Sequence, residues 1–450
     1  MRIFLLFAFA AFSFSMAAQD SLNCSVLFHW DDPTIPGSAF YDNAYNEIWG
    51  YAANDREYAI IGSTQGTHIF DVTDPENASE IHFIEGAATG GNIVHRDFHD
   101  YAGYLYVVCD EGNSTLQIID LNNLPDEAPL VYDSNAILIR SHNIFIDESK
   151  AMMYVCGGED ELRLVSLEDP TNPVEVLDCN DDLPFWGTIG YQHDIYVKDG
   201  IAYCNGGDAL YIVDFSDLEN VQFLGSLSDY PDSGYNHSGW LHESGTYYAM
   251  ADETHGMKMK ILDVTDPTDI QVVSLFGNEV APTSIPHNLI FTGNILHVSY
   301  YYDGYYAFDC SDMANPTVAA FYDTSSIPNG MSYKGAWGVY PFLPSGNVLV
   351  SDMQEGLFVL APSFPTNVEM PVVKQTGIFP NPVERGSQLN IDFPDAAIAR
   401  LFDIAGTQIS ETILSEEKST LDIPEKVTPG LYILRVSGSE KTITERIIVE

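Results

Sequence analysis

Four histidines recur at a similar place in successive stretches of the chain, each followed by a small or polar residue. They are His142, His193, His237 and His287. Three further stretches open in the same way with Trp49, Arg96 and Trp337. Imidazole combined with carboxylate is a ligand set for zinc, manganese or iron, whereas a carboxylate-rich loop suits calcium. The spacing therefore predicts a divalent metal as cofactor, either calcium or a transition metal, if the fold gathers these residues around one axis.

Carboxylates lie next to several of these residues and in the loops further along each stretch. Asp97 and Asp194 directly follow two of these residues, and the loops contain Asp110, Glu111, Glu159, Asp160, Asp208, Asp252, Glu253, Asp303, Asp352 and Glu355. We predict that the four histidines bind the metal. The residues predicted to bind a polar ligand beside it are Trp49, Arg96, Asp97, Asp194, Asp252 and Trp337. A structural interpretation stays open, because a repeat also copies residues that bond the backbone of a neighbouring unit.

The elements that position these residues belong to an internal repeat of roughly 44 to 51 residues. Six segments share a short apolar strand that runs into a turn of Asp, Ser or Pro. They are residues 70–75, 119–121, 165–170, 213–217, 262–267 and 308–312. Another β-rich run lies upstream of each segment, and a fourth strand follows, as at 174–177. Four antiparallel strands per unit are typical of a β-propeller blade.

A seventh unit opens at Trp337 and lacks its fourth strand. Residues 25–30 form an orphan strand near the N-terminus, followed by a turn. We predict that this strand completes the last unit, because a closed ring leaves no unpaired strand edge between the first and last blades. The sequence thus predicts an all-β chain with a seven-bladed propeller at residues 24–361.

The N-terminal residues indicate the compartment of the protein, and its net charge limits the kinds of partner that it can bind. Met1 and Arg2 precede an apolar run to Met16 and then small residues, which predicts a secretory signal peptide at residues 1–18. No later stretch approaches the about 20 apolar residues of a membrane-spanning helix. With 65 acidic against 18 basic residues, the net charge of −47 repels phosphates and argues against nucleic acid as a partner. Outside the cytosol, the six cysteines either pair or fill buried strand positions.

A separate module follows a Pro-containing linker at residues 362–376. Residues 377–450 alternate apolar strands with Gly and Pro turns, which predicts a small β-sandwich. Its motifs are Pro380-Asn381-Pro382, the strand and turn at 401–406, and Pro429-Gly430 before Tyr432. This combination resembles the C-terminal sorting domain of type IX secretion cargo. The resemblance implies passage through the periplasm, handling by the type IX machinery, and a final location outside the cell or on the outer-membrane surface.

The repeat itself resembles a family of secreted proteins, choice-of-anchor B, whose propellers carry LVIVD-type repeats. The similarity runs from about Asn46 to Leu360 and is clearest at residues 141–147, 286–288 and 337–347. That family joins one propeller to different surface-anchoring tails. It therefore implies a location and gives no established activity.

Two functions stay open at this point. The first is a binding or scaffolding module whose propeller face recognises an extracellular glycan, peptide or small molecule. The second is a metal-dependent hydrolase or lyase that acts on extracellular polymer fragments, with the histidines as metal ligands. No nucleophile elbow, phosphate-binding Gly loop, HExxH or CxxC pattern decides between them, so whether the chain is an enzyme is left open.

Overall fold

The computed structural model describes residues 21–158, 162–364 and 378–449, the last apart from 380–382, 384, 392–396, 404–406, 416–419 and 439–441. The chain divides into two compact units, residues 1–370 and 371–450. The predicted signal peptide at 1–18 lies outside the described residues, as does the predicted linker beyond residue 364.

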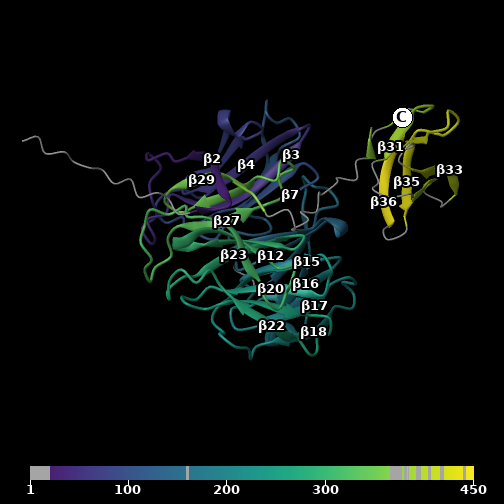
Figure 1. The fold of residues 1–450 in the computed structure, drawn as a ribbon. Helices are drawn as coiled ribbons and strands as arrows, with labels where there is room; N and C mark the ends of the chain where they lie inside the picture. The colour runs from purple at the N-terminus through teal and green to yellow at the C-terminus, as the bar shows by residue number, and fades with distance from the viewer. Residues whose placement is uncertain are drawn as a thin grey trace, which may run out of the picture. The chain divides into compact units, whose positions relative to one another are not determined.

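The first unit consists of six four-stranded sheets and one five-stranded sheet, all antiparallel (Figure 1). Each sheet begins with an inner strand, and the seven inner strands contact one another in a closed cycle. In order they are β3 (Tyr45–Ala53), β7 (Arg96–Tyr101), β11 (Asn143–Asp147), β15 (Asp194–Lys198), β19 (Asn236–Leu241), β23 (Pro286–Thr292) and β27 (Ala336–Tyr340). This cycle of sheets confirms the predicted all-β propeller.

The remaining strands follow outward from the axis in each blade. The second strands are β4 (Arg56–Ser63), β8 (Tyr104–Cys109), β12 (Met152–Cys156), β16 (Ile201–Asn205), β20 (Tyr247–Asp252), β24 (Ile295–Tyr300) and β28 (Val348–Asp352). The third strands are β5 (Gly66–Asp71), β9 (Leu116–Asp120), β13 (Leu162–Ser166), β17 (Leu210–Asp214), β21 (Met259–Asp263), β25 (Gly304–Asp309) and β29 (Gly356–Pro362). The outer strands are β6 (Ser79–Glu85), β10 (Leu130–Ser134), β14 (Val174–Asp178), β18 (Gln222–Leu227), β22 (Gln271–Phe276), β26 (Thr317–Tyr322) and β2 (Cys24–Trp30), and β1 (Ser21–Leu22) adds a fifth strand beside β26.

Helical structure is confined to single turns between strands. The described ones are α1 (Cys179–Asp182), η1 (Pro75–Asn77), η2 (Glu148–Lys150), η3 (Trp186–Thr188) and η4 (Tyr301–Asp303). No helix in the described part of the chain is long and apolar enough to cross a membrane.

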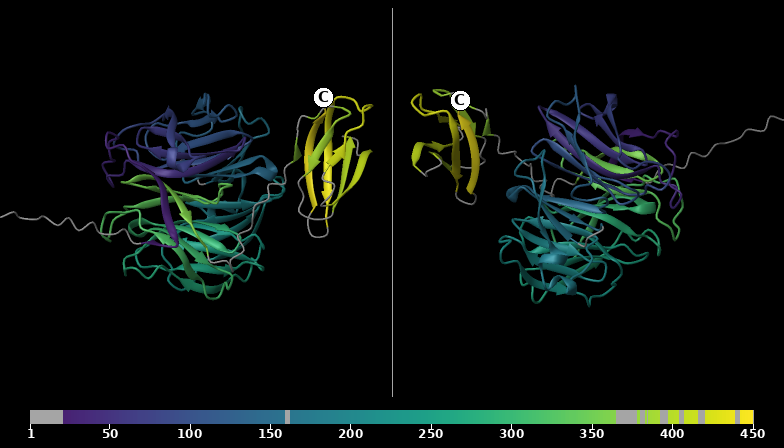
Figure 2. Two further views of the ribbon diagram at one scale, coloured as in Figure 1. Left: turned by 45° about the horizontal axis from the view of Figure 1, so that its top comes forward. Right: turned by 180° about the vertical axis from the view of Figure 1, so that it is seen from behind.

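The N-terminal strand closes the ring, as predicted. β2 pairs antiparallel with β29, from Cys24 opposite Pro362 to Trp30 opposite Leu357. In Figure 2 the purple N-terminal strand lies within the green last blade, beside segments from the other end of the propeller. The last blade therefore combines strands that are more than 300 residues apart in the sequence, and the chain that continues from β2 to β3 links it to the first blade.

The repeated Asp turns have a local physical cause. After the third strand of a blade, the Asp carboxylate accepts a hydrogen bond from the backbone N–H two residues on, at 3.0 Å for Asp71, 3.0 Å for Asp263 and 2.9 Å for Asp309. Such Asx turns reverse the chain toward the outer strand. Apolar side chains of consecutive sheets fill the spaces between blades, for example Val108 against Ile144. All six cysteines are unpaired, and five of them are buried.

The second unit holds two sheets around its own apolar core. One sheet has the order β30 (Ile378–Phe379), β31 (Gln388–Ile391) and β34 (Thr420–Asp422). The other has the order β33 (Gln408–Leu414), β32 (Ala397–Asp403), β35 (Gly430–Ser437) and β36 (Thr442–Val449). Leu389, Leu401 and Leu434 are fully buried between them, which fits the small β-sandwich expected from the sequence.

Candidate metal centre at the propeller axis

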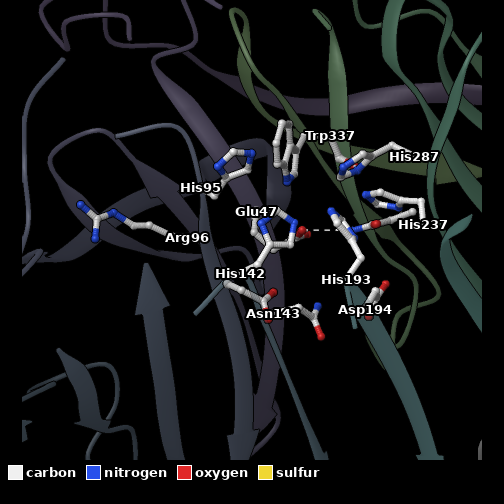
Figure 3. Close-up of a pocket in the computed structure, with 12 residues that line it drawn as sticks. Glu47, His95, Arg96, His142, Asn143, His193, Asp194, His237, His287 and Trp337 are labelled. Carbon is white, nitrogen blue, oxygen red and sulfur yellow. Dashed lines mark hydrogen bonds between the residues drawn. The ribbon is translucent and has the colours of Figure 1, made fainter. Parts of the chain in front are cut away.

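Five histidines and one tryptophan form a closed ring at one end of the central channel (Figure 3). In order around the axis they are His95, His142, His193, His237, His287 and Trp337. The centroids of neighbouring rings are 4.8, 4.1, 4.3, 4.4 and 4.5 Å apart, and Trp337 lies 5.1 Å from His95. The structure thus brings together the four histidines predicted as metal ligands and adds a fifth.

The fifth member, His95, was missed because Arg96 matched the sequence pattern instead. Arg96 is almost completely buried and points away from the ring, donating hydrogen bonds to the backbone oxygens of Ser63 at 2.8 Å and Ala88 at 2.5 Å. His95, one residue earlier, turns into the ring. Glu111 holds this arrangement, since its carboxylate accepts the backbone N–H of His95 at 3.0 Å and the imidazole Nδ1.

The hydrogen bonds of the ring leave imidazole nitrogens free to bind an ion. Nδ1 of His287 donates to the carbonyl oxygen of Trp337 at 2.6 Å, so Nε2 of a neutral His287 carries the lone pair. Nδ1 of His142 donates to Asp110 at 2.9 Å, the carboxylate partner that metal-binding imidazoles typically have. Nδ1 of His193 and Nδ1 of His237 are buried without a hydrogen-bond partner. Buried polar atoms left unpaired are rare and often mark a missing ligand.

The protonation of the ring also suits a metal. Burial lowers the pKa of His287 to about 3, and burial together with the neighbouring imidazoles holds the pKa of His193 and of His237 well below the usual range. Burial is the largest influence on His142 and opposes its charged form, but the hydrogen bond to Asp110 together with the charges of Asp110, Glu253 and Asp194 raises that pKa. Three of the five imidazoles are therefore neutral at neutral pH, the state in which histidine binds metals.

Beneath the ring lies a layer of carboxyl groups formed by the buried Glu47 and Asp97 and the partly buried Asp194. They share with the histidines a void of about 20 Å³. Glu47 accepts a hydrogen bond from the Asn288 amide at 3.0 Å, and Asp97 accepts one from the backbone N–H of Ile144 at 2.6 Å. Burial raises the pKa of all three carboxyl groups, that of Asp194 to about 7. A cation bound in the ring above would lower these pKa values and favour the carboxylate forms, since Arg96 is turned away.

A wider cavity of about 450 Å³ opens on the other side of the ring. Glu253 reaches into it, with a carboxylate oxygen 3.8 Å from Nε2 of His237 and the other oxygen accepting the hydroxyl of Tyr301. Burial raises the pKa of Glu253 to about 7. Five tyrosines line the cavity: Tyr41, Tyr191, Tyr235, Tyr301 and Tyr333.

Two predicted ligand-binding residues lie elsewhere. Trp49 sits deeper in the channel, two residues further along β3 than Glu47, where its indole donates to Asp100 at 2.8 Å and packs 4.6 Å from His99. Asp252 is completely buried in an ion pair with Lys260 and does not line the cavity; its neighbour Glu253 does. Asp97 and Asp194 lie in the layer under the histidines, and Trp337 lies in the ring itself.

The donor set fits a divalent transition metal. Three groups each keep their ligand atoms within 4.8 Å of one another: His142 with His193 and His237, His95 with Asp110 and His142, and His237 with Glu253 and His287. Nitrogens that bind zinc tetrahedrally at 2.0–2.1 Å lie about 3.4 Å apart. Zinc bound by one of these groups would therefore require the ligand atoms to move inward by roughly 1 Å. Imidazole suits zinc, copper, iron or nickel better than calcium.

Comparison with known proteins identifies the second unit. Residues 377–450 match the family described as "Secretion system C-terminal sorting domain". The C-terminal unit is a type IX sorting domain. The sorting domain indicates that the protein is secreted or carried to the outer-membrane surface through type IX secretion.

The first unit is similar to solved propellers in fold. The crystal structure of the β-propeller domain of Cps50 (Swd1) from Myceliophteria thermophila matches with a TM-score of 0.51 and 12% sequence identity, covering 75% of this chain and 98% of that domain. At this identity the match supports the propeller fold alone. No curated protein matches the chain.

Proposed function

We propose that this secreted propeller binds one divalent transition-metal ion in the histidine ring and uses it to hold an extracellular ligand in the cavity above. The observation that carries the proposal is the convergence of five imidazoles, two of which have a buried Nδ1 without a hydrogen bond. A purely structural histidine has its nitrogens paired, as His297 does with Thr292 and Tyr305, each at 2.8 Å. The carboxyl groups beneath the ring also support a cation, because a bound cation would lower their pKa and favour the carboxylate forms.

The test is the metal content of the purified mature protein, measured by mass spectrometry after dialysis against a mixture of divalent metals. We expect one transition-metal ion per chain in the wild type. His237→Phe keeps an aromatic ring between its neighbours but removes both nitrogens, so it should lose the metal. His82→Phe, on the outer strand β6, is the matched control and should retain it. Metal-free wild-type protein under these conditions would overturn the proposal.

A second candidate function, a metal-dependent hydrolase or lyase, is favoured by Glu253. Its carboxylate lies beside His237 and its pKa is raised to about 7, which suits a group that exchanges protons near neutral pH. The check is product release from a panel of polysaccharides and peptides by metal-loaded protein. Enzyme function requires that Glu253→Gln abolishes the release while the metal stays bound. Absence of any turnover across the panel would leave the binding function.

Two further assignments belong to the proposal. The first is export directed by a signal peptide at residues 1–18. The second is membership of the choice-of-anchor B family, supported by the segments at 141–147, 286–288 and 337–347 and by the pairing of a propeller with a sorting domain. In this view the sorting domain delivers the propeller, and the propeller face acts as the recognition or scaffolding surface.

A further inference from the structure

We infer that the cavity above the histidine ring binds a neutral saccharide between two facing walls of tyrosine side chains. The inference rests on the proposed function, because it names the class of ligand that the proposed binding site takes. It is carried by the position of the tyrosines around the ring, by their exposure, and by the charges that line the cavity.

The two walls stand over opposite members of the six-membered ring. His193 and Trp337 are three places apart in the cycle and so face each other across the axis. Tyr235 packs against His193 with ring centroids 5.2 Å apart, and Tyr191 lies 6.4 Å from the same histidine. Tyr301 packs edge-on 5.0 Å from His287 and 6.1 Å from Trp337, so the second wall stands over this neighbouring pair. One wall therefore rises on each side of the metal position.

The wall over Trp337 continues outward through two more tyrosines. Tyr333 lies 5.4 Å from Tyr301, and Tyr41 lies 5.6 Å from Tyr333, both in edge-to-face contact. Each ring supports the next, and Glu253 fixes the hydroxyl of Tyr301. This wall is consequently a preformed surface rather than a set of independent side chains.

The width of the ring that forms the floor of the cavity suits a saturated sugar ring. A six-membered cycle with sides of 4.1 to 5.1 Å spans about 9 Å between opposite members. A sugar ring in van der Waals contact with a wall on each side needs about 7–8 Å between the aromatic rings, since carbon atoms touch at 3.5–4.0 Å. The cavity volume of about 450 Å³ leaves room for more than one sugar unit.

The exposed fraction of each side chain distinguishes the tyrosines that only form the cavity wall from those that are available to contact a ligand. Tyr191 is 40% exposed and Tyr235 is 39% exposed, although both are large aromatic residues beside a hollow. Tyr301, by contrast, is 1% exposed. Aromatic surface left open next to a cavity stabilises the fold little and is available to a ligand.

The lining charges select a hydroxyl-rich neutral ligand. None of the described residues that line the cavity is Lys or Arg. An anionic ligand would be attracted by the proposed metal ion alone, against the carboxylates of the cavity and the net charge of −47. The acceptors are the carboxylates of Asp110 and Glu253, and Thr254 adds a hydroxyl. Saccharides offer hydroxyl donors at their edges and apolar C–H faces for stacking. An organic cation could also stack on tyrosine, but the ion in the floor would repel it.

The experiment measures binding by isothermal titration calorimetry on the metal-loaded full chain. The probes are neutral trisaccharides of glucose, xylose, mannose and galactose, a trisaccharide of uronic acids, and tetramethylammonium. We expect at least one neutral trisaccharide to bind, with Tyr235→Ala and Tyr191→Ala each weakening it tenfold or more. Tyr132→Ala on the outer strand β10 is the control and should leave the affinity unchanged.

The metal content of every variant is measured in parallel, so the two proposals fail separately. Loss of saccharide binding in Tyr235→Ala with one metal ion still bound is the expected result. Absence of binding by all neutral probes to protein that holds its metal overturns the saccharide inference alone. Preferential binding of tetramethylammonium or of the uronic acid trisaccharide also overturns it. Saccharide binding by protein that takes up no metal would support the inference and sink the proposed metal site.

Discussion

Replacing His193 by Ala should separate a metal ligand from a structural histidine. His193 is 6% exposed and packs between His142 and His237, at 4.1 and 4.3 Å, but its Nδ1 makes no hydrogen bond. In metal-free protein the truncation therefore removes packing and leaves one hydrogen-bond partner, the backbone of His237, unpaired. The matched comparison is His297→Ala, since His297 is 1% exposed and both its nitrogens are hydrogen-bonded.

The two variants should respond differently to metal. A buried group left unpaired costs about 1–3 kcal/mol, and His297→Ala leaves one more partner unpaired than His193→Ala. Metal-free His297→Ala should therefore be roughly 1–3 kcal/mol less stable than metal-free His193→Ala. At a metal concentration 100 times the Kd, binding stabilises the wild type by about 2.7 kcal/mol. For a unit of this size that is a rise in Tm of about 5 °C. His297→Ala should keep this rise, and His193→Ala should lose it.

The assay is calorimetric melting of both variants and the wild type, with and without excess zinc. A rise in Tm that is the same in His193→Ala as in the wild type would refute the assignment of His193 as a ligand. A large loss of stability in metal-free His193→Ala, equal to that of His297→Ala, would instead favour the structural interpretation of the ring.

The other predictions concern the fold that carries the ring. Deleting residues 24–31 removes β2 and should abolish the cooperative melting transition of the propeller, because β29 loses its partner; an unchanged transition would contradict ring closure. Lys260→Met leaves the fully buried Asp252 without its ion-pair partner and should cost about 3–5 kcal/mol in urea unfolding, whereas a loss under 1 kcal/mol would argue against the buried pair. Burial raises the pKa of Asp352 from 3.8 to about 7, so the folded chain keeps a proton that the unfolded chain releases, and stability falls as the pH rises from about 4 to 7. Asp352→Asn should flatten that fall in unfolding curves across this range, and parallel profiles for the two proteins would count against it.

The parts of the fold that depend on local chemistry could be read from the sequence. The Asp turns repeat because each carboxylate bonds a backbone N–H two residues on, and this leaves the same residues at the same place in each unit. The orphan strand at 25–30 could be matched to the last blade because one blade was short of a strand. The Asp turn is a signal within a few residues of sequence, and the match of the orphan strand follows from counting the strands in each unit.

The parts that failed depend on contacts between distant segments. Both His95 and Arg96 fit the pattern of an aromatic, His or Arg residue before a small or polar one. Which of the two side chains enters the ring depends on contacts with distant residues. Glu111 accepts a hydrogen bond from the backbone N–H of His95, and the backbone oxygens of Ser63 and Ala88 accept hydrogen bonds from Arg96. Trp49 was predicted to lie at the same level as the four histidines. It lies deeper in the channel, because it is two residues further along β3 than Glu47, which lies beneath the ring. The sequence signal that could have identified His95 is its position directly before Arg96, the residue aligned with the four histidines.

Ring closure by the N-terminal strand has a consequence for how the protein is made. The partner of Cys24 is Pro362, so the first strand cannot pair until almost the entire propeller has been synthesised. At about 5–20 residues per second this delay is roughly 15–70 s. A chain that stops early keeps two open sheet edges, which aggregate readily. The ring closes just before residue 377, where the sorting domain begins. A chain that stops before this point therefore lacks both a closed propeller and the sorting domain that directs its secretion.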